Sequence, residues 1–178
     1  MDRMLGRLKV LVVDDNHHMI NIVKTILRGF EVKDFYDASN APDAFNIVRG
    51  TAVDLIVTDF AMDPVNGCDF TRQIRAAEDS PNHFVPIIML TAYTEKSKVE
   101  QARDAGVTEF CAKPVTATEL YRKVCTVINT PRSFIRTGVY FGPDRRRRKD
   151  DGYEGKERRE NLFGPKSSVL LTKPQNAA

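Results

Sequence analysis

Residues 9–15 read KVLVVDD, an apolar run that ends abruptly in two carboxylates. A continuous apolar run rich in β-branched residues is typical of a strand buried on both faces, as in parallel sheets. Helical periodicity follows over residues 17–28, and Gly29 ends that pattern. The change from a buried strand to an amphipathic helix predicts an α/β fold.

The same alternation recurs four more times before residue 130. We expect further strands at 32–36, 54–58, 85–90 and 107–111, and further helices at 41–49, 68–77, 95–105 and from Thr116 onward. Thr116 and Glu119 have the spacing of a capping box. Five strands, each followed by a helix, predict a doubly wound five-stranded parallel sheet of the flavodoxin-like kind. Ligands of such folds bind at the carboxyl ends of the strands.

Length and charge divide the chain into two parts. Its 178 residues allow one ordinary domain, residues 1–129, and an arginine-rich C-terminal extension, residues 130–178. Residues 1–131 hold 15 Lys+Arg against 18 Asp+Glu, whereas residues 132–178 hold 12 against 6. The basic extension therefore indicates an anionic partner. Its prolines and charges predict an arm that is largely disordered without a ligand.

The cysteines and the apolar runs indicate a cytoplasmic protein. Cys68, Cys111 and Cys125 have no CxxC spacing and lie in apolar surroundings, so we expect reduced thiols. The N-terminal residues lack the pattern of a signal peptide. No run reaches the roughly 18 apolar residues of a membrane span, so we expect no membrane insertion.

Polar residues stand at the ends of four predicted strands. The first strand ends in Asp14 and Asp15, the third in Asp59 and the fourth in Thr91, and the fifth runs into Lys113. Three clustered carboxylates repel one another unless a cation lies between them, and hard oxygen ligands suit Mg²⁺. We expect all three aspartates to be metal ligands, Asp59 also being the nucleophile, with Lys113 and Thr91 contacting a phosphoryl group. Singly, such residues are often helix caps or surface loops; their combination favours a site.

Several short motifs resemble those of a response-regulator receiver domain of the CheY type. They are VLVVDDN at 10–16, DLIVTDF at 54–60, Asn66-Gly67, LTA at 90–92, AGVTEF at 105–110 and KPV at 113–115. The resemblance covers about two thirds of the chain and implies Mg²⁺-dependent phosphoryl transfer to Asp59 from a histidine kinase or a phosphotransfer protein. It also implies a metal ligand from the carbonyl of Ala61, a cis bond before Pro114, and a switch in which Thr91 and Phe110 move.

The loop after Asp59 departs from the family pattern. The family usually has Met followed directly by Pro, whereas here Asp63 stands between Met62 and Pro64. We expect this additional carboxylate to reshape the loop or to alter metal affinity.

A seven-residue phrase occurs twice in the extension. It reads Tyr, any residue, Gly, any residue, acid, Arg, Arg; the copies span 140–146 and 153–159. A guanidinium fork fits the O6/N7 edge of guanine, and a tyrosine ring offers a stacking face. Acids spaced as RxxD could accept from the opposite edge of the same base. The expected binding residues are Tyr140, Asp144, Arg145, Arg146, Arg147, Arg148, Asp150, Asp151, Tyr153, Arg158 and Arg159.

A guanine-bearing, doubly anionic and two-fold symmetric molecule fits this repeat, and cyclic di-GMP is such a molecule. The extension also resembles that of the Cle-type subfamily of CheY-like proteins. That resemblance implies cyclic di-GMP binding and a contact at the flagellar motor switch protein. No helix-turn-helix pattern follows residue 130, so we expect the output to be a binding event. We also expect that the protein is not an enzyme.

Two other interpretations stay open. The protein could be a single-domain phospho-receiver whose extension is only a tether, or the arginines could form a nucleic-acid-binding arm. The acids among the arginines would repel a phosphate backbone, which argues against nucleic acid as a partner. The same acids weaken binding to a membrane surface.

Overall fold

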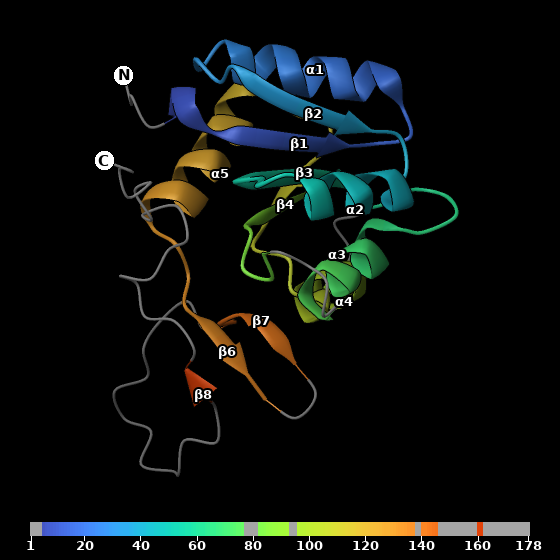
Figure 1. The fold of residues 1–178 in the computed structure, drawn as a ribbon, viewed down its shortest axis with the longest axis vertical. Coiled ribbons are helices and arrows are strands. Elements are labelled where there is room, and N and C mark those ends of the chain that lie inside the picture. The colour runs from blue at the N-terminus through green and yellow to red at the C-terminus, as the bar shows by residue number, and fades with distance from the viewer. Residues whose placement is uncertain (1–4, 77–81, 93–95, 138–139, 146–159, 162–178) are drawn as a thin grey trace.

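A computed structural model of the chain describes residues 5–76, 82–92, 96–137, 140–145 and 160–161. In chain order the elements are η1 (Leu5–Arg7), β1 (Lys9–Val13), α1 (His17–Arg28), β2 (Asp34–Ala38), α2 (Ala41–Gly50), β3 (Leu55–Asp59), α3 (Gly67–Ala76), β4 (Ile87–Thr91), α4 (Lys96–Ala105), β5 (Glu109–Ala112), α5 (Ala117–Asn129), β6 (Phe134–Arg136), β7 (Phe141–Pro143) and β8 (Glu160–Asn161). Figure 1 shows their arrangement in space.

The first five strands form one parallel sheet in the order β2-β1-β3-β4-β5. The order places β1 and β3 in the middle, where both are almost wholly buried, as the apolar runs predicted. The register sets Asp59 opposite Leu90 and Thr91 opposite Ala112. The carboxyl ends of the central strands are therefore aligned at one edge of the sheet, and the predicted fold class is confirmed.

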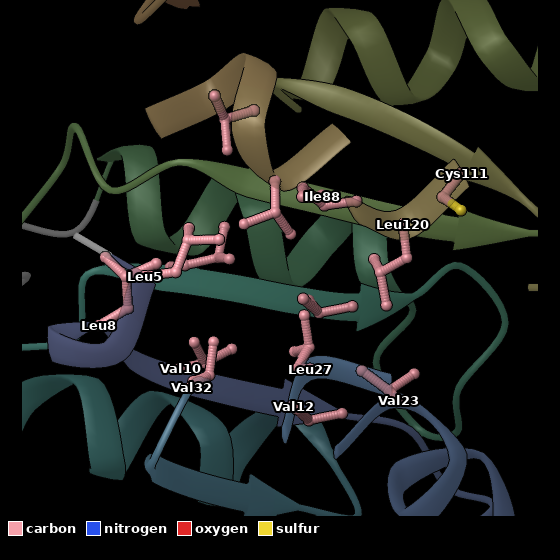
Figure 2. Packing of buried hydrophobic residues seen from close by; sticks show 14 of the residues in the cluster. Leu5, Leu8, Val10, Val12, Val23, Leu27, Val32, Ile88, Cys111 and Leu120 are labelled. Carbon is pink, nitrogen blue, oxygen red and sulfur yellow. The ribbon is translucent and has the colours of Figure 1, made fainter. Parts of the chain in front are cut away.

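Two layers of helices enclose the sheet (Figure 1). Helices α1 and α5 pack on one face, where Val23, Leu27 and Leu120 join side chains from β1 and β4 in one apolar cluster (Figure 2). Helices α2 and α3 pack on the other face, and α4 closes it near β5. Alternate residues of β1 belong to opposite clusters, because successive strand side chains point to opposite faces.

Local capping explains where the helices begin. The side chain of Asn16 accepts a hydrogen bond from the backbone N–H of His18, and Thr116 accepts one from that of Glu119. The Thr116 cap follows the predicted pattern. All three cysteines are free thiols, and Cys125 is the least buried of them.

The second strand begins later than the sequence pattern predicts, at Asp34 rather than at Val32. The chain turns tightly after α1, where Glu31 adopts a φ of 71° and the N–H of Val32 bonds to the carbonyl of Leu27. Val32 is buried by this turn rather than by strand pairing. A buried apolar residue just before the strand therefore led the sequence pattern to place the start of the strand too early.

The first part of the extension contains two short strands, β6 and β7, within an arm that the sequence predicts to be largely disordered. Strands β6 and β7 form an antiparallel hairpin, and β8 pairs with the other edge of β6. Phe134 and Ile135 are each 6% exposed. The hairpin lies beside the ends of α3 and α4 (Figure 1). Apolar residues inside a charged segment thus bury against the domain.

Candidate phosphoryl-acceptor site

Three carboxylates meet at the carboxyl edge of the sheet. Asp14 and Asp15 follow β1, and Asp59 ends β3. Their ligand atoms all lie within 4.8 Å of one another. Asp14 and Asp59 are buried, whereas Asp15 is exposed, so the cluster opens to solvent on one side. The structure therefore brings the three predicted metal ligands together.

Lys113 lies between two of these carboxylates. Its Nζ is 2.9 Å from Oδ1 of Asp59 and 3.3 Å from Oδ2 of Asp14. Burial alone would lower the pKa of Lys113, but the hydrogen bond and charge of Asp59 and the charge of Asp14 raise it overall. The ammonium is thus held charged beside the predicted nucleophile. The peptide bond from Lys113 to Pro114 is cis, as the family resemblance implies.

The pKa of the Asp14 carboxyl group is raised above its ordinary value. Burial raises its pKa, and the charge of Asp59 adds to the increase, while the backbone N–H of Asn16 and the ammonium of Lys113 oppose it. The net direction is upward, with burial as the largest cause and repulsion by Asp59 as a smaller one. A divalent cation would relieve this repulsion.

The donor set fits Mg²⁺. Carboxylate oxygens from three residues are hard ligands, and one open side leaves space for water and a phosphoryl oxygen. Asp63 is exposed and does not belong to the carboxylate cluster, although the bond before Pro64 is cis. The extra acid therefore adds no fourth carboxylate to the group. Ala61, the implied carbonyl ligand, lies in the exposed part of the same loop.

Two further residues fix the shape of the site. Thr91 ends β4 with 6% of its surface exposed, and its carbonyl accepts a hydrogen bond of 2.8 Å from the N–H of Lys113. Gly67 begins α3 directly beneath the nucleophile strand, where a Cβ atom would lie 2.1 Å from the carbonyl oxygen of Asp59. The close approach of α3 to β3 therefore requires glycine at position 67.

In the extension the structure describes three of the eleven predicted ligand-binding residues. Tyr140, Asp144 and Arg145 belong to the hairpin, and the guanidinium carbon of Arg145 lies 3.8 Å from the centroid of the Tyr140 ring. The backbone N–H of Asp144 donates to the carbonyl of Ser133 at 2.7 Å. The predicted residues that fall outside the described part of the chain are Arg146, Arg147, Arg148, Asp150, Asp151, Tyr153, Arg158 and Arg159.

Arg75 joins the receiver domain to the extension, and the sequence analysis did not predict this role. It is 5% exposed and donates hydrogen bonds to the carbonyls of His83, Val85 and Gly106 at 2.7–3.2 Å. Its guanidinium lies over the ring of Phe134. Burial lowers the pKa of Arg75 to about 9. Two features of the sequence could have indicated this contact. Arg75 lies on the inward side of α3, and the extension contains the aromatic residues Phe134 and Phe141.

The fold and the acidic cluster together are those of a receiver module of two-component signalling. Residues 10–125 match the model of the response regulator receiver domain, and the chain belongs to that family. Within the described residues, no helix is both long and apolar enough to cross a bilayer.

Similar proteins agree with this assignment. Chemotaxis protein CheY-3 of Vibrio cholerae is 32% identical over 125 residues, which cover 70% of this chain and 95% of the relative. The solved structure of chemotaxis response regulator CheY4 of Vibrio cholerae has a TM-score of 0.62 at 26% identity, with 67% of this chain and 98% of that chain covered. The receiver domain of sensor histidine kinase PA1611 from Pseudomonas aeruginosa, solved with magnesium coordinated in its active-site cleft, has a TM-score of 0.60 at 28% identity over 66% of this chain and 94% of that one.

Proposed function

We propose that this protein is a cytoplasmic signalling protein whose receiver domain accepts a phosphoryl group on Asp59 and whose extension binds cyclic di-GMP. Its input is a histidine kinase or a phosphotransfer protein. Its output is a protein contact, at the flagellar motor switch, rather than a catalysed reaction. The two halves of this function rest on different observations and are tested separately.

The phosphoryl-acceptor half rests on the contact of Lys113 with both Asp14 and Asp59. An oxygen of Asp59 attacks the phosphorus of the donor, an acyl phosphate forms, and the bond from phosphorus to the donor breaks. Lys113 lies where it can neutralise the phosphoryl oxygens, and Mg²⁺ held by Asp14, Asp15, Asp59 and the carbonyl of Ala61 would supply the remaining positive charge. Thr91 would donate its hydroxyl hydrogen to a phosphoryl oxygen.

Incubation with acetyl phosphate and Mg²⁺ tests this half. The wild type should gain the mass of one phosphoryl group, and it should gain none after chelation of the metal. Asp59→Asn should stay unmodified, whereas Asp63→Asn, which changes an exposed acid in the same loop, should still be modified. Modification of Asp59→Asn at the wild-type rate would contradict the assignment of Asp59.

The cyclic di-GMP half rests on Arg145 and Tyr140. The stacked guanidinium shows that the Tyr140 ring presents a face to a planar cationic group, and a guanine base is planar as well. Arg145 begins the arginine run, and the repeat of the seven-residue phrase matches the two-fold symmetry of the ligand. Ordering the arm opposes binding at about 1–2 kcal/mol per fixed residue, and we expect an affinity near micromolar, about 8 kcal/mol.

Calorimetric titration of the full-length protein with cyclic di-GMP tests this half. Replacement of Arg145, Arg146, Arg147 and Arg148 by alanine should abolish the heat of binding. Replacement of Arg7 and Arg28, which are basic and exposed but distant in sequence, should not. An oligonucleotide that binds more tightly than cyclic di-GMP, with a steep loss of affinity in salt, would favour the nucleic-acid interpretation instead.

A further inference from the structure

The first arginine of the run is already bound to the receiver domain. Nη1 of Arg145 lies 3.2 Å from Oδ1 of Asp104, in the last turn of α4. The other side of the guanidinium rests on Tyr140. An arginine that would read a guanine edge is therefore occupied by a carboxylate and a ring of the same chain.

Hydrogen bonds hold the backbone of Asp144, the residue before Arg145. The N–H of Asp144 bonds to the carbonyl of Ser133, and the carbonyl of Asp144 accepts a hydrogen bond from Arg132. The hydroxyl of Tyr140 donates to the carbonyl of Pro143 at 2.8 Å. The hairpin thus holds the ring and the start of the arginine run at a set place beside α4.

We propose that Asp104 holds Arg145 in a resting position over Tyr140, and that an anionic, guanine-bearing ligand must displace this contact in order to bind. The inference rests on the proposed cyclic di-GMP function and concerns the regulation of that site. Asp104 is then an intramolecular competitor supplied by the receiver domain, because its carboxylate lies at Nη1 of Arg145, one of the nitrogens that would face the O6/N7 edge of guanine.

The competition couples the two halves of the protein. Asp104 lies two residues before Gly106, whose carbonyl binds the buried Arg75. When a ligand displaces the Arg145 side chain from Asp104, this end of α4 loses its ion pair with the extension. Coupling of binding free energies is reciprocal. A change of the receiver that draws Asp104 away from Arg145 therefore raises ligand affinity, and ligand binding favours that change by the same factor.

The expected magnitude is modest because the pair is partly exposed. The side chain of Asp104 is 49% exposed and that of Arg145 is 36% exposed. Ion pairs with such exposure correspond to about a two- to fivefold change in a binding constant. We therefore expect Asp104→Asn to tighten cyclic di-GMP binding about two- to fivefold. The opposite sign would mean that Asp104 accepts hydrogen bonds from the bound base.

Glu100→Gln provides the matched control. Glu100 lies one helical turn before Asp104, has a similarly exposed side chain, and pairs only loosely with Lys96 at 3.9 Å. Both variants remove one negative charge and one ion pair within α4, that of Asp104 with Arg103 at 3.3 Å and that of Glu100 with Lys96 at 3.9 Å. In the part of the chain that the structure describes, Asp104 and not Glu100 also pairs with Arg145. Long-range attraction of the anionic ligand should change similarly in both.

The experiment is a calorimetric titration of four full-length variants with cyclic di-GMP: Asp104→Asn, Glu100→Gln, Arg145→Ala and Asp104→Asn with Arg145→Ala. The proposal expects tighter binding in the first, little change in the second, and no effect of the Asp104 change once Arg145 is absent. Unchanged or weaker binding in Asp104→Asn, or tightening that persists without Arg145, would overturn it.

Tryptic cleavage after Arg145 distinguishes failure of this inference from failure of the proposed function. The resting contact should slow that cleavage, so Asp104→Asn should accelerate it several-fold and Glu100→Gln should not, with no ligand present. If cleavage is equal in all variants, the contact does not hold Arg145 and the proposal is wrong. If Asp104→Asn accelerates cleavage but no variant binds cyclic di-GMP, the contact holds Arg145 but cyclic di-GMP is not the ligand.

Discussion

The guanidinium carbon of Arg75, on α3, lies 5.1 Å from the centroid of the Phe134 ring, on β6. This contact joins the receiver domain to the extension. Phe134 also meets Phe84 and Phe141, so a buried cation is covered by an aromatic cluster from both parts. Within the described residues, Arg75 has no recorded ion pair with a carboxylate, and its hydrogen bonds go to backbone carbonyls.

Arg75→Met is expected to lower the free energy of unfolding by about 2–4 kcal/mol. The methionine keeps much of the volume but leaves the carbonyls of His83, Val85 and Gly106 without their donor, and buried unpaired acceptors are costly. Urea unfolding measures the change. Arg72→Met, on the exposed side of the same helix, should change stability by less than about 0.5 kcal/mol. A variant at position 75 as stable as the wild type would show that the donors are dispensable.

Removal of residues 131–178 is expected to destabilise the receiver domain. The truncation exposes Phe84 and the guanidinium of Arg75, which Phe134 and Phe141 cover in the full chain. We expect a loss of roughly 2–4 kcal/mol in urea unfolding, since burial of an aromatic side chain contributes about 1.5–3 kcal/mol. A chain that ends at Asn161 keeps β6, β7 and β8 and should unfold like the full chain. Equal stability of both truncations would contradict docking of the hairpin.

Gly67→Ala is expected to impair the phosphoryl-acceptor site. Its Cβ would lie 2.1 Å from the carbonyl oxygen of Asp59, so either α3 or β3 must shift. We expect a loss of about 1–3 kcal/mol in stability and slower phosphorylation of Asp59 by acetyl phosphate. Gly50→Ala is the control, because nothing lies within 4 Å of the added Cβ at the end of α2. Unimpaired phosphorylation of the Gly67 variant would show that this approach is not needed.

Asp14→Asn is expected to stabilise the metal-free protein at neutral pH. Burial first, and then the charge of Asp59, raise the pKa of Asp14 above its ordinary value of 3.8. The folded state therefore binds this proton more tightly than the unfolded state, and stability falls as pH rises from 3.8 through the folded pKa. The destabilisation is largest above the folded pKa of Asp14 and disappears in acid.

Thermal unfolding at two pH values measures this effect. At pH 7.5 we expect Asp14→Asn to raise the midpoint by about 2–4 °C, corresponding to about 1 kcal/mol, and at pH 4.5 by less. Asp15→Asn, which changes the exposed carboxylate of the cluster, should have a smaller effect. Mg²⁺ should stabilise the wild type more than the Asp14 variant. A larger gain for Asp14→Asn at pH 4.5 than at pH 7.5 would contradict the linkage.

The sheet and its acidic cluster follow from local sequence patterns. The apolar run of 10–13, with three valines among four residues, predicted a strand buried on both faces. Carboxylates at the ends of such strands were expected to lie close together because parallel strands end at one edge of the sheet. Asp14, Asp15 and Asp59 therefore lay together as predicted. These features follow from local patterns and from topology.

The packing of the extension on the domain depends on residues that lie far apart in the chain. Phe134, Ile135 and Phe141 are too few to indicate a core by periodicity. Phe134 and Phe141 pack against Phe84, and Arg75 lies over Phe134, so their partners come from some 50 residues or more earlier in the chain. The contact of Arg145 with Asp104 is equally non-local. Local sequence specifies strands, helices and the ends at which polar groups gather. The pairing of distant side chains depends on packing in three dimensions, which a one-dimensional pattern does not contain.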